Sequence, residues 1–381
     1  MKKLGAVFGQ KFGWERPNWF ALKGTPQIDN WSFRRSKWFE SVGQESLNVK
    51  NNVGILDMTP FAKCYISGPN AEKWLDYILA SRIPKTPGKI HLCYALNPNG
   101  GVRSEFIVLR NPNDTFYLVS AGALERYDHD YLKKKIPSDN TVQFEPATTR
   151  IGVLVIAGPK SRELMERVSD SDFSNQEFPW LSAKQVDIGF SNSLVARVNF
   201  VGELGWEIHH PIENQNHIFD VLMEAGKDLQ IKPFGIRAMD SLRLEKSYCV
   251  IGNELSIEYA AYESKLDRFI DLKKDTFIGR DELLKWQEKG FSTSLVTLEV
   301  HEVADADALG NNPIFFHGET IGRATSGGYG FRLKKSLALA MVKPEVAQIG
   351  TNLHIEILGD RFNATVISNS PYDPNNLHLK N

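Results

Sequence analysis

The hydrophobic pattern of this 381-residue chain changes near residue 290. Before that point, segments with the period of a helix alternate with short apolar runs of strand length. After it, short β-rich runs such as SLVTLEV, LALAMV and LHIEIL are separated by glycine and proline. The late pattern predicts a separate all-β module, a small barrel, and we place the boundary within 278–292.

The earlier part of the chain predicts a mixed α and β region. We expect helices at residues 71–80, 124–135, 160–168, 218–226 and 238–246. We expect strands at residues 105–109, 115–120, 151–157 and 194–199. The first forty residues are irregular and rich in large rings, which need a surface to cover. We therefore expect an aromatic arm at 1–40, an α+β region at 41–285 and a β-barrel at 286–381.

Composition and charge argue against several classes of protein. The net charge is −1, so a nucleic-acid partner is not expected. No apolar run approaches the length of about eighteen residues that a membrane helix needs, and the N-terminus lacks the apolar core of a signal peptide. We expect a cytoplasmic protein without a membrane partner. Cys64, Cys93 and Cys249 form no C-x-x-C pair and are expected to be buried thiols.

Familiar cofactor signatures are missing as well. No G-x-G-x-x-G follows a strand and no Walker A segment occurs, so a dinucleotide-binding half is not expected. His209 and His210 are adjacent, and neighbouring residues of a strand face opposite ways. A metal site is therefore not expected.

The segment VGELGWEIHH, residues 201–210, combines two glycines and two glutamates in a strand-like frame. Glycine in a strand permits close approach of a ligand or of another backbone. Glu207 can accept two parallel N–H bonds from an amino-pyrimidinone ring, the planar donor pair of a pterin. The alternative is that Glu207 caps a turn, and the residues alone do not decide between the two.

Three further segments carry polar groups at defined positions. Asn-Gly-Gly at 99–101 is typical of a tight hairpin turn, which would aim Ser104 and Glu105 at whatever lies beyond it, or simply leave them exposed. The segment FGIRAMDSLRLEK predicts the start of a helix on which Arg243 and Glu245 form salt bridges. The segment ATSGGYG, residues 324–330, predicts a glycine-rich turn between β elements.

The segments NGG, AGPKSR, VGELGWEIHH, FGIRAMDSLRLEK, FIGRDEL and ATSGGYG occur in one order along the chain. In this order they resemble the glycine-cleavage T-protein (aminomethyltransferase) family, and FGWERPNWF and SFRRSKWFE resemble the folate-binding half of dimethylglycine and sarcosine dehydrogenases. The resemblance implies an α+β fold of three domains in a ring: two intertwined α+β domains and a C-terminal β-barrel around a central tetrahydrofolate site.

The resemblance also implies a set of site residues. Glu207 matches the glutamate that grips the pterin, and Phe200 stands where the family has a tyrosine. Ser104 and Glu105 stand in the places of paired aspartates, so both are assigned to catalysis. The cofactor-binding set is completed by three residues: Ser120 in place of an asparagine, Arg237 two residues before Met239, which replaces a family arginine, and Tyr94.

The resemblance leaves three hypotheses for function. In the first, the protein captures a one-carbon unit from an N-methylated amine as 5,10-methylene-tetrahydrofolate, and a separate flavoprotein dehydrogenase oxidises the amine. In the second, it transfers a methyl group directly from a sulfonium or quaternary ammonium compound to tetrahydrofolate, with the aromatic arm as a cation–π cage. In the third, it is a non-catalytic folate-binding subunit.

Overall fold

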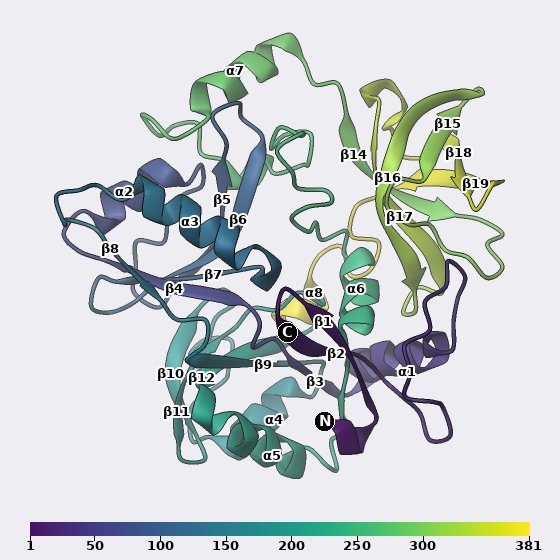
Figure 1. Ribbon diagram of the computed structural model, residues 1–381. Helices are drawn as coiled ribbons and strands as arrows, with labels where there is room; N and C mark the ends of the chain where they lie inside the picture. The colour runs from purple at the N-terminus through teal and green to yellow at the C-terminus, as the bar shows by residue number, and fades with distance from the viewer.

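The computed structural model describes residues 1–381 as two mixed α/β units and a barrel grouped around helix α6 (Figure 1). The chain builds a five-stranded sheet, a six-stranded sheet, a closed six-stranded barrel and an N-terminal hairpin. No helix is both long enough and apolar enough to cross a membrane. The expected α+β fold with a C-terminal barrel is confirmed.

The five-stranded sheet has the order β5-β6-β7-β4-β8. Helices α2 (Ala71–Ile78) and α3 (Glu125–Lys135) cover one of its faces and share a core with it through residues such as Leu75, Phe106 and Leu132. Asn-Gly-Gly forms the predicted turn between β5 and β6, where Gly100 has φ +83°. The strands are β4 (Ala62–Ser67), β5 (Ile90–Leu96), β6 (Val102–Arg110), β7 (Phe116–Ser120) and β8 (Gln143–Pro146).

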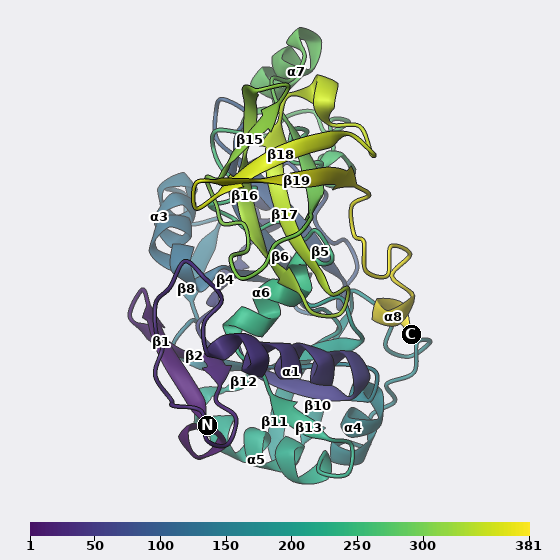
Figure 2. The same ribbon diagram turned by 90° about the vertical axis from the view of Figure 1, so that its right-hand side faces the viewer.

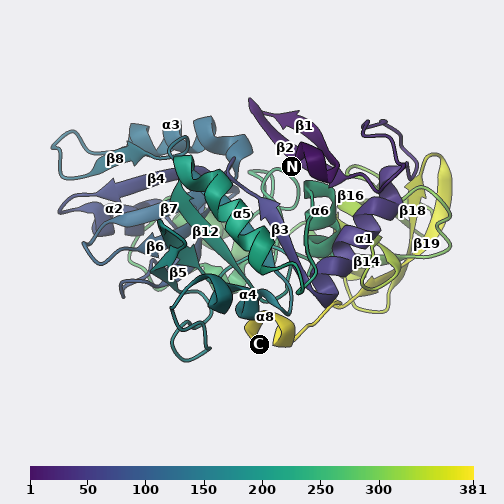
Figure 3. The same cartoon turned by 90° about the horizontal axis from the view of Figure 1, so that it is seen from below.

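The six-stranded sheet has the order β10-β11-β12-β9-β3-β13. Helices α4 (Ser161–Val168) and α5 (Gln215–Ala225) pack on one face, as Figure 3 shows from below, while α1 (Trp38–Asn51) and α6 (Ile236–Leu244) pack on the other. The strands are β3 (Val53–Asp57), β9 (Ile151–Ala157), β10 (Ala183–Ile188), β11 (Ser191–Ala196), β12 (Gly205–Pro211) and β13 (Ile231–Pro233).

The two α/β units are intertwined in the chain. Strand β3 belongs to the six-stranded sheet, β4 to β8 build the other sheet, and the chain then returns with β9 beside β3. Tyr117 and Val119 of one sheet share a small core with Ala183 and Ala196 of the other. The two sheets therefore contact each other directly, and we call the face that each turns toward the other its inner face.

The N-terminal residues form a hairpin of β1 (Ala6–Lys11) and β2 (Trp14–Phe20). Trp19 is fully buried against α1 and α6, as expected of an arm that covers a body. Glu45 of α1 joins the hairpin to α6 because its carboxylate accepts the backbone N–H groups of Phe20 and Gly235 at 2.6 and 2.7 Å. In contrast, Trp31 and Phe33 are 87% and 73% exposed.

The barrel has the order β14-β17-β16-β15-β18-β19, closed by the pairing of β19 with β14, and it stands over α6 in Figure 2. Its strands are β14 (Ser294–Val300), β15 (Pro313–Phe316), β16 (Glu319–Gly330), β17 (Lys335–Val342), β18 (Asn352–Ile357) and β19 (Asp360–Ile367). Helix α7 (Arg280–Lys289) precedes the barrel and α8 (Leu377–Lys380) ends the chain.

The prediction of a glycine-rich turn at ATSGGYG was wrong. These residues belong to β16, which carries an irregularity between Ala324 and Ser326. Glycine at position 327 allows the backbone of β16 to approach that of Ala308, because a Cβ on Gly327 would lie only 2.3 Å from the carbonyl oxygen of Ala308.

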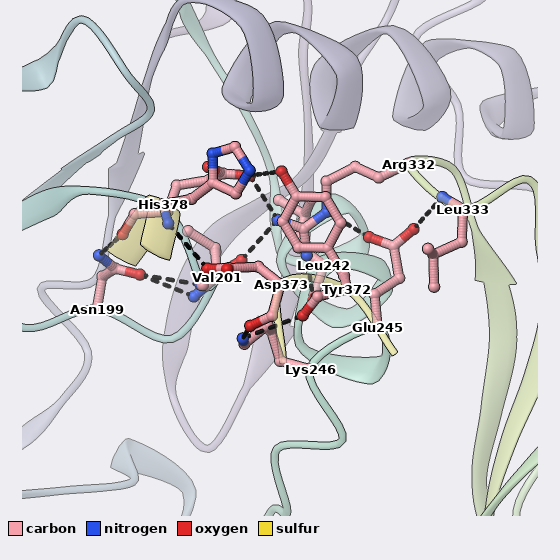
Figure 4. A network of polar contacts seen from close by, with 12 residues as sticks. Asn199, Val201, Leu242, Glu245, Lys246, Arg332, Leu333, Tyr372, Asp373 and His378 are labelled. Atoms are coloured by element: carbon pink, nitrogen blue, oxygen red, sulfur yellow. Dashed lines mark hydrogen bonds and ion pairs between the residues drawn. The ribbon is translucent and has the colours of Figure 1, made fainter. Parts of the chain in front are cut away.

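A buried network around Arg332 joins the barrel to α6 and to the loop before β12 (Figure 4). The Arg332 guanidinium pairs with Glu245, donates to Glu203 Oε1 at 2.8 Å, and donates to the carbonyl oxygens of Val201 and Leu242 at 3.0 and 2.7 Å. Tyr372, from the C-terminal tail, donates its hydroxyl to Glu203 at 2.7 Å. Three separate segments of the chain therefore converge on a cation that a fourth segment, in the barrel, provides.

We predict that Arg332→Met lowers the free energy of unfolding by about 3–5 kcal/mol, because it leaves two buried carboxylates without a cation. Urea unfolding followed by circular dichroism measures the change. Arg361→Met is the matched control, since Arg361 is half-exposed and 3.8 Å from Glu356. A loss for Arg332→Met as small as that of the control would contradict the assignment.

Candidate functional site

Glu105 lies on the inner face of the five-stranded sheet. It is directly opposite Tyr94 on β5, and the Tyr94 hydroxyl donates a hydrogen bond to the Glu105 carboxylate. Burial raises the pKa of Glu105 to about 7, although the Tyr94 hydrogen bond acts in the other direction. Glu105 can therefore hold or release a proton near neutral pH, which a general acid or base requires.

Aromatic and sulfur-containing side chains surround the Glu105–Tyr94 pair. The ring of Phe269 meets Tyr94 edge-on at 5.4 Å, and the Arg268 guanidinium lies 4.6 Å from the Phe269 ring. Cys249 packs against the same cluster, and burial raises its thiol pKa. Of the cysteines, Cys64 and Cys93 are buried as expected, whereas Cys249 is only partly buried.

Ser104 and Ser120 lie together on the opposite, helix-covered face of that sheet. Their hydroxyl groups donate to the two oxygens of Asp128 on α3, at 2.7 and 2.8 Å. Burial raises the pKa of Asp128 to about 6. The alternation of a strand separates Ser104 from Glu105, so the structure does not bring the two predicted catalytic residues together. No local pattern distinguishes Asp128 from the other charged residues of its helix.

Glu207 lies within β12 on the inner face of the six-stranded sheet, while its neighbours Trp206 and Ile208 enter the core under α4 and α5. It is 4% exposed and its side-chain partner is His209, whose Nε2 is 3.2 Å from Glu207 Oε2. No backbone N–H donates to this carboxylate. Glu207 is therefore not the cap of a turn.

Phe200 and Arg237 occupy different surroundings. Phe200, half-buried in the loop before β12, packs on Tyr248 with 5.6 Å between ring centroids. Arg237, on α6, pairs with Asp29 of the N-terminal segment at 2.7 Å and lies 4.5 Å from the Trp38 ring. The structure thus places Arg237 in the contact with the arm. Tyr248 was not found from sequence because nothing local distinguishes it from a core tyrosine.

The two adjacent histidines face opposite ways. His210 Nε2 is 2.6 Å from Gln215 on α5, whereas His209 faces Glu207 and Tyr117. No group of three or more His, Cys, Asp or Glu side chains is arranged to hold a metal ion. A surface cavity between α2 and β5, lined by residues such as Arg82 and Lys89, contains none of the predicted site residues.

Comparison with known sequences identifies the class of protein that has this fold. Residues 1–274 match the GCVT N-terminal domain, and residues 294–373 match the glycine cleavage T-protein C-terminal barrel domain. The chain belongs to the glycine-cleavage T-protein family. In line with this, the crystal structure of aminomethyltransferase T from Bartonella henselae has the same fold, with a TM-score of 0.84 and 23% identity over 98% of this chain and 96% of that one.

Two kinds of relative are similar over nearly the whole chain. Human mitochondrial dimethylglycine dehydrogenase is 33% identical over 93% of this chain, which spans 41% of that protein. The aminomethyltransferase of Thermoanaerobacter sp. (strain X514) is 30% identical over 88% of this chain and 91% of its own length. The 4-methylaminobutanoate oxidase (formaldehyde-forming) of Paenarthrobacter nicotinovorans is 30% identical over 100% of this chain, which spans 46% of it. The chain thus spans less than half of its dehydrogenase and oxidase relatives.

The raised pKa of Glu105 predicts a pH-dependent cost to stability. In the folded state the Glu105 carboxyl keeps its proton up to about pH 7. A glutamate in an unfolded chain releases its proton at about pH 4.3. The wild-type free energy of unfolding should therefore fall between these values as the pH rises, and Glu105→Gln should escape this fall.

Urea unfolding at pH 5, 6, 7 and 8 measures this difference, which we expect to grow in favour of Glu105→Gln by on the order of 1 kcal/mol. Glu319→Gln, at an exposed site of the barrel, controls for the loss of one negative charge. A difference between wild type and Glu105→Gln that stays constant with pH would show that Glu105 ionises normally.

Proposed function

We propose that the protein catalyses tetrahydrofolate-dependent one-carbon transfer. The observation that carries the proposal is the buried Glu207 carboxylate, which faces inward from β12 and has an oxygen, Oε1, that receives no hydrogen bond from the protein. The whole-length similarity to an aminomethyltransferase supports the same conclusion.

The residues present fit a reduced pterin. A carboxylate with a free acceptor atom suits the adjacent N–H donors of an amino-pyrimidinone ring, and a hydrogen bond to a charged acceptor is stronger than one between neutral groups. Phe200, Tyr248 and Tyr94 offer ring faces and edges that suit a flat bicyclic ligand. Tetrahydrofolate would supply the nucleophilic nitrogens that receive the one-carbon unit.

Glu105 is the group that this chain provides for moving a proton. It is partly accessible on the inner face, and with a pKa of about 7 it exists in both protonation states near neutral pH. Ser104 instead binds Asp128, so in this proposal it supports β6 from behind and Glu105 alone acts on the reacting groups. Tyr94 orients Glu105 through its hydroxyl.

The donor that we propose is an N-methylated amine of the dimethylglycine or sarcosine kind. Its methyl group is oxidised by a separate flavoprotein to the level of formaldehyde, and the product is 5,10-methylene-tetrahydrofolate. Similarity to dimethylglycine dehydrogenase and to 4-methylaminobutanoate oxidase supports this choice.

Direct transfer from an onium compound receives less support, because the rings of the N-terminal segment already bind cations of the protein itself. Arg237 lies 5.9 Å from the Trp31 ring and 4.5 Å from the Trp38 ring. Arg35 lies 4.6 Å from the Phe39 ring. A purely folate-binding role receives less support, because Glu105 faces inward and burial raises its pKa to about 7, a value that suits proton transfer.

We predict that Glu207→Gln weakens tetrahydrofolate binding about tenfold or more, because an amide NH₂ would face the N–H donors of the pterin. Isothermal titration with tetrahydrofolate under anaerobic conditions measures the affinity. Glu213→Gln, at an exposed position just beyond β12, is the control and should bind as the wild type does. Unchanged affinity in Glu207→Gln would remove the pterin assignment.

A second prediction concerns the donor. With dimethylglycine, tetrahydrofolate and a flavoprotein that oxidises this amine, the protein should convert the released one-carbon unit into 5,10-methylene-tetrahydrofolate and suppress free formaldehyde. Mass spectrometry of the folates follows the reaction, with Glu105→Ala as the impaired variant. Formation of 5-methyl-tetrahydrofolate from an onium donor without any flavoprotein would favour the direct-transfer hypothesis instead.

A further inference from the structure

A buried row of three polar side chains bridges the inner faces of the two sheets. Glu207 and His209 belong to β12, and Tyr117 belongs to β7 of the other sheet. His209 Nε2 lies 3.2 Å from Glu207 Oε2, and His209 Nδ1 lies 3.1 Å from the Tyr117 hydroxyl. All three side chains are almost inaccessible, at 4%, 4% and 2% exposure for Glu207, His209 and Tyr117.

The partners of His209 determine its tautomer. Burial raises the pKa of the Tyr117 phenol well above its usual value, so the hydroxyl keeps its proton and can donate it to Nδ1. A neutral imidazole that accepts at Nδ1 must carry its proton on Nε2. Nε2–H then donates to Glu207 Oε2. The edge-on packing of the Tyr117 and His209 rings, 5.5 Å apart at 88°, keeps both rings in this arrangement.

The row has a direct consequence for the carboxylate that would read the pterin. The terminal torsion of a glutamate is broad, so a carboxylate without a partner samples many orientations. Here Oε2 is held by His209, while Oε1 receives no hydrogen bond from the protein. The plane of the carboxylate is therefore set before any ligand arrives, which reduces the ordering cost of binding.

We propose that His209 and Tyr117 are positioning residues for Glu207: Tyr117 fixes the tautomer of His209, and His209 fixes the orientation of the carboxylate that recognises the 2-amino side of the pterin. This inference rests on the proposed function, since it names the residues behind the pterin contact. According to this proposal, the selectivity for the amino group of the ligand depends on His209 and Tyr117, which belong to two different sheets.

The test compares two probes, tetrahydrofolate and its 2-desamino-2-methyl analogue, which lacks the amino group. Their affinities are measured by anaerobic titration for wild type, His209→Leu, His209→Gln and Tyr117→Phe. His210→Gln is the matched control, because His210 is the neighbouring histidine on the opposite face of β12. Thermal unfolding of each variant verifies that it is folded.

We expect wild type and His210→Gln to prefer tetrahydrofolate over the analogue by about tenfold or more. This preference should collapse in His209→Leu, fall partly in Tyr117→Phe, and recover partly in His209→Gln, whose amide can still donate to Glu207. A merely structural role would weaken both probes equally and leave their ratio unchanged.

The same titrations separate the two ways of failing. A full preference for the amino group in folded His209→Leu and Tyr117→Phe would overturn the positioning roles while leaving the proposed function in place. If His209→Leu does not fold, His209→Gln and Tyr117→Phe decide the matter by the same ratio. Failure of the wild type to bind tetrahydrofolate would overturn the proposed function and this inference together.

Discussion

The buried guanidinium of Arg332 is the interaction on which the position of the barrel against α6 and the six-stranded sheet depends. It extends from the barrel to two carboxylates and two carbonyl oxygens that belong to α6 and to the loop before β12. A buried cation with these acceptors leaves no low-energy alternative, because any shift would strand a charge away from water. The barrel is thereby held over the sheet that carries Glu207.

The two-residue period of a strand decides which polar side chains can act together. On β6, Glu105 faces the inner side with Tyr94, while Ser104 faces α3 and binds Asp128. On β12, Glu207 and His209 face inward, and the residues between and beside them fill the core. The predicted site residues thus separate into an inner group that can meet a ligand and an outer group that supports the strands.

Much of the architecture was predictable because it follows from local patterns. The helices at α2, α3, α4 and α5, the strand β9 and the turn at Asn-Gly-Gly formed close to their expected positions. The prediction of a turn at ATSGGYG was wrong because Gly327 is needed for close approach to the backbone of Ala308, which lies elsewhere in the chain, and not for a turn. Arg243 forms the expected ion pair within its own helix, with Asp240 at 2.6 Å, and a second with Glu254. Glu245 instead pairs with Arg332 of the barrel, and both Arg243 and Glu245 are buried.

The sequence by itself determined the element types and the late barrel, and it singled out Glu105 and Glu207 as candidate site residues, since hydrophobic period, turn chemistry and motif order are properties of neighbouring residues. Only the tertiary structure decided what those carboxylates touch. Tyr117 lies 92 residues from His209 along the chain, and Arg332 lies 87 from Glu245. Such partners, like the burial that shifts the pKa of Glu105, exist only after two sheets and a barrel have packed together, because desolvation and hydrogen-bond geometry are set by contacts across the fold.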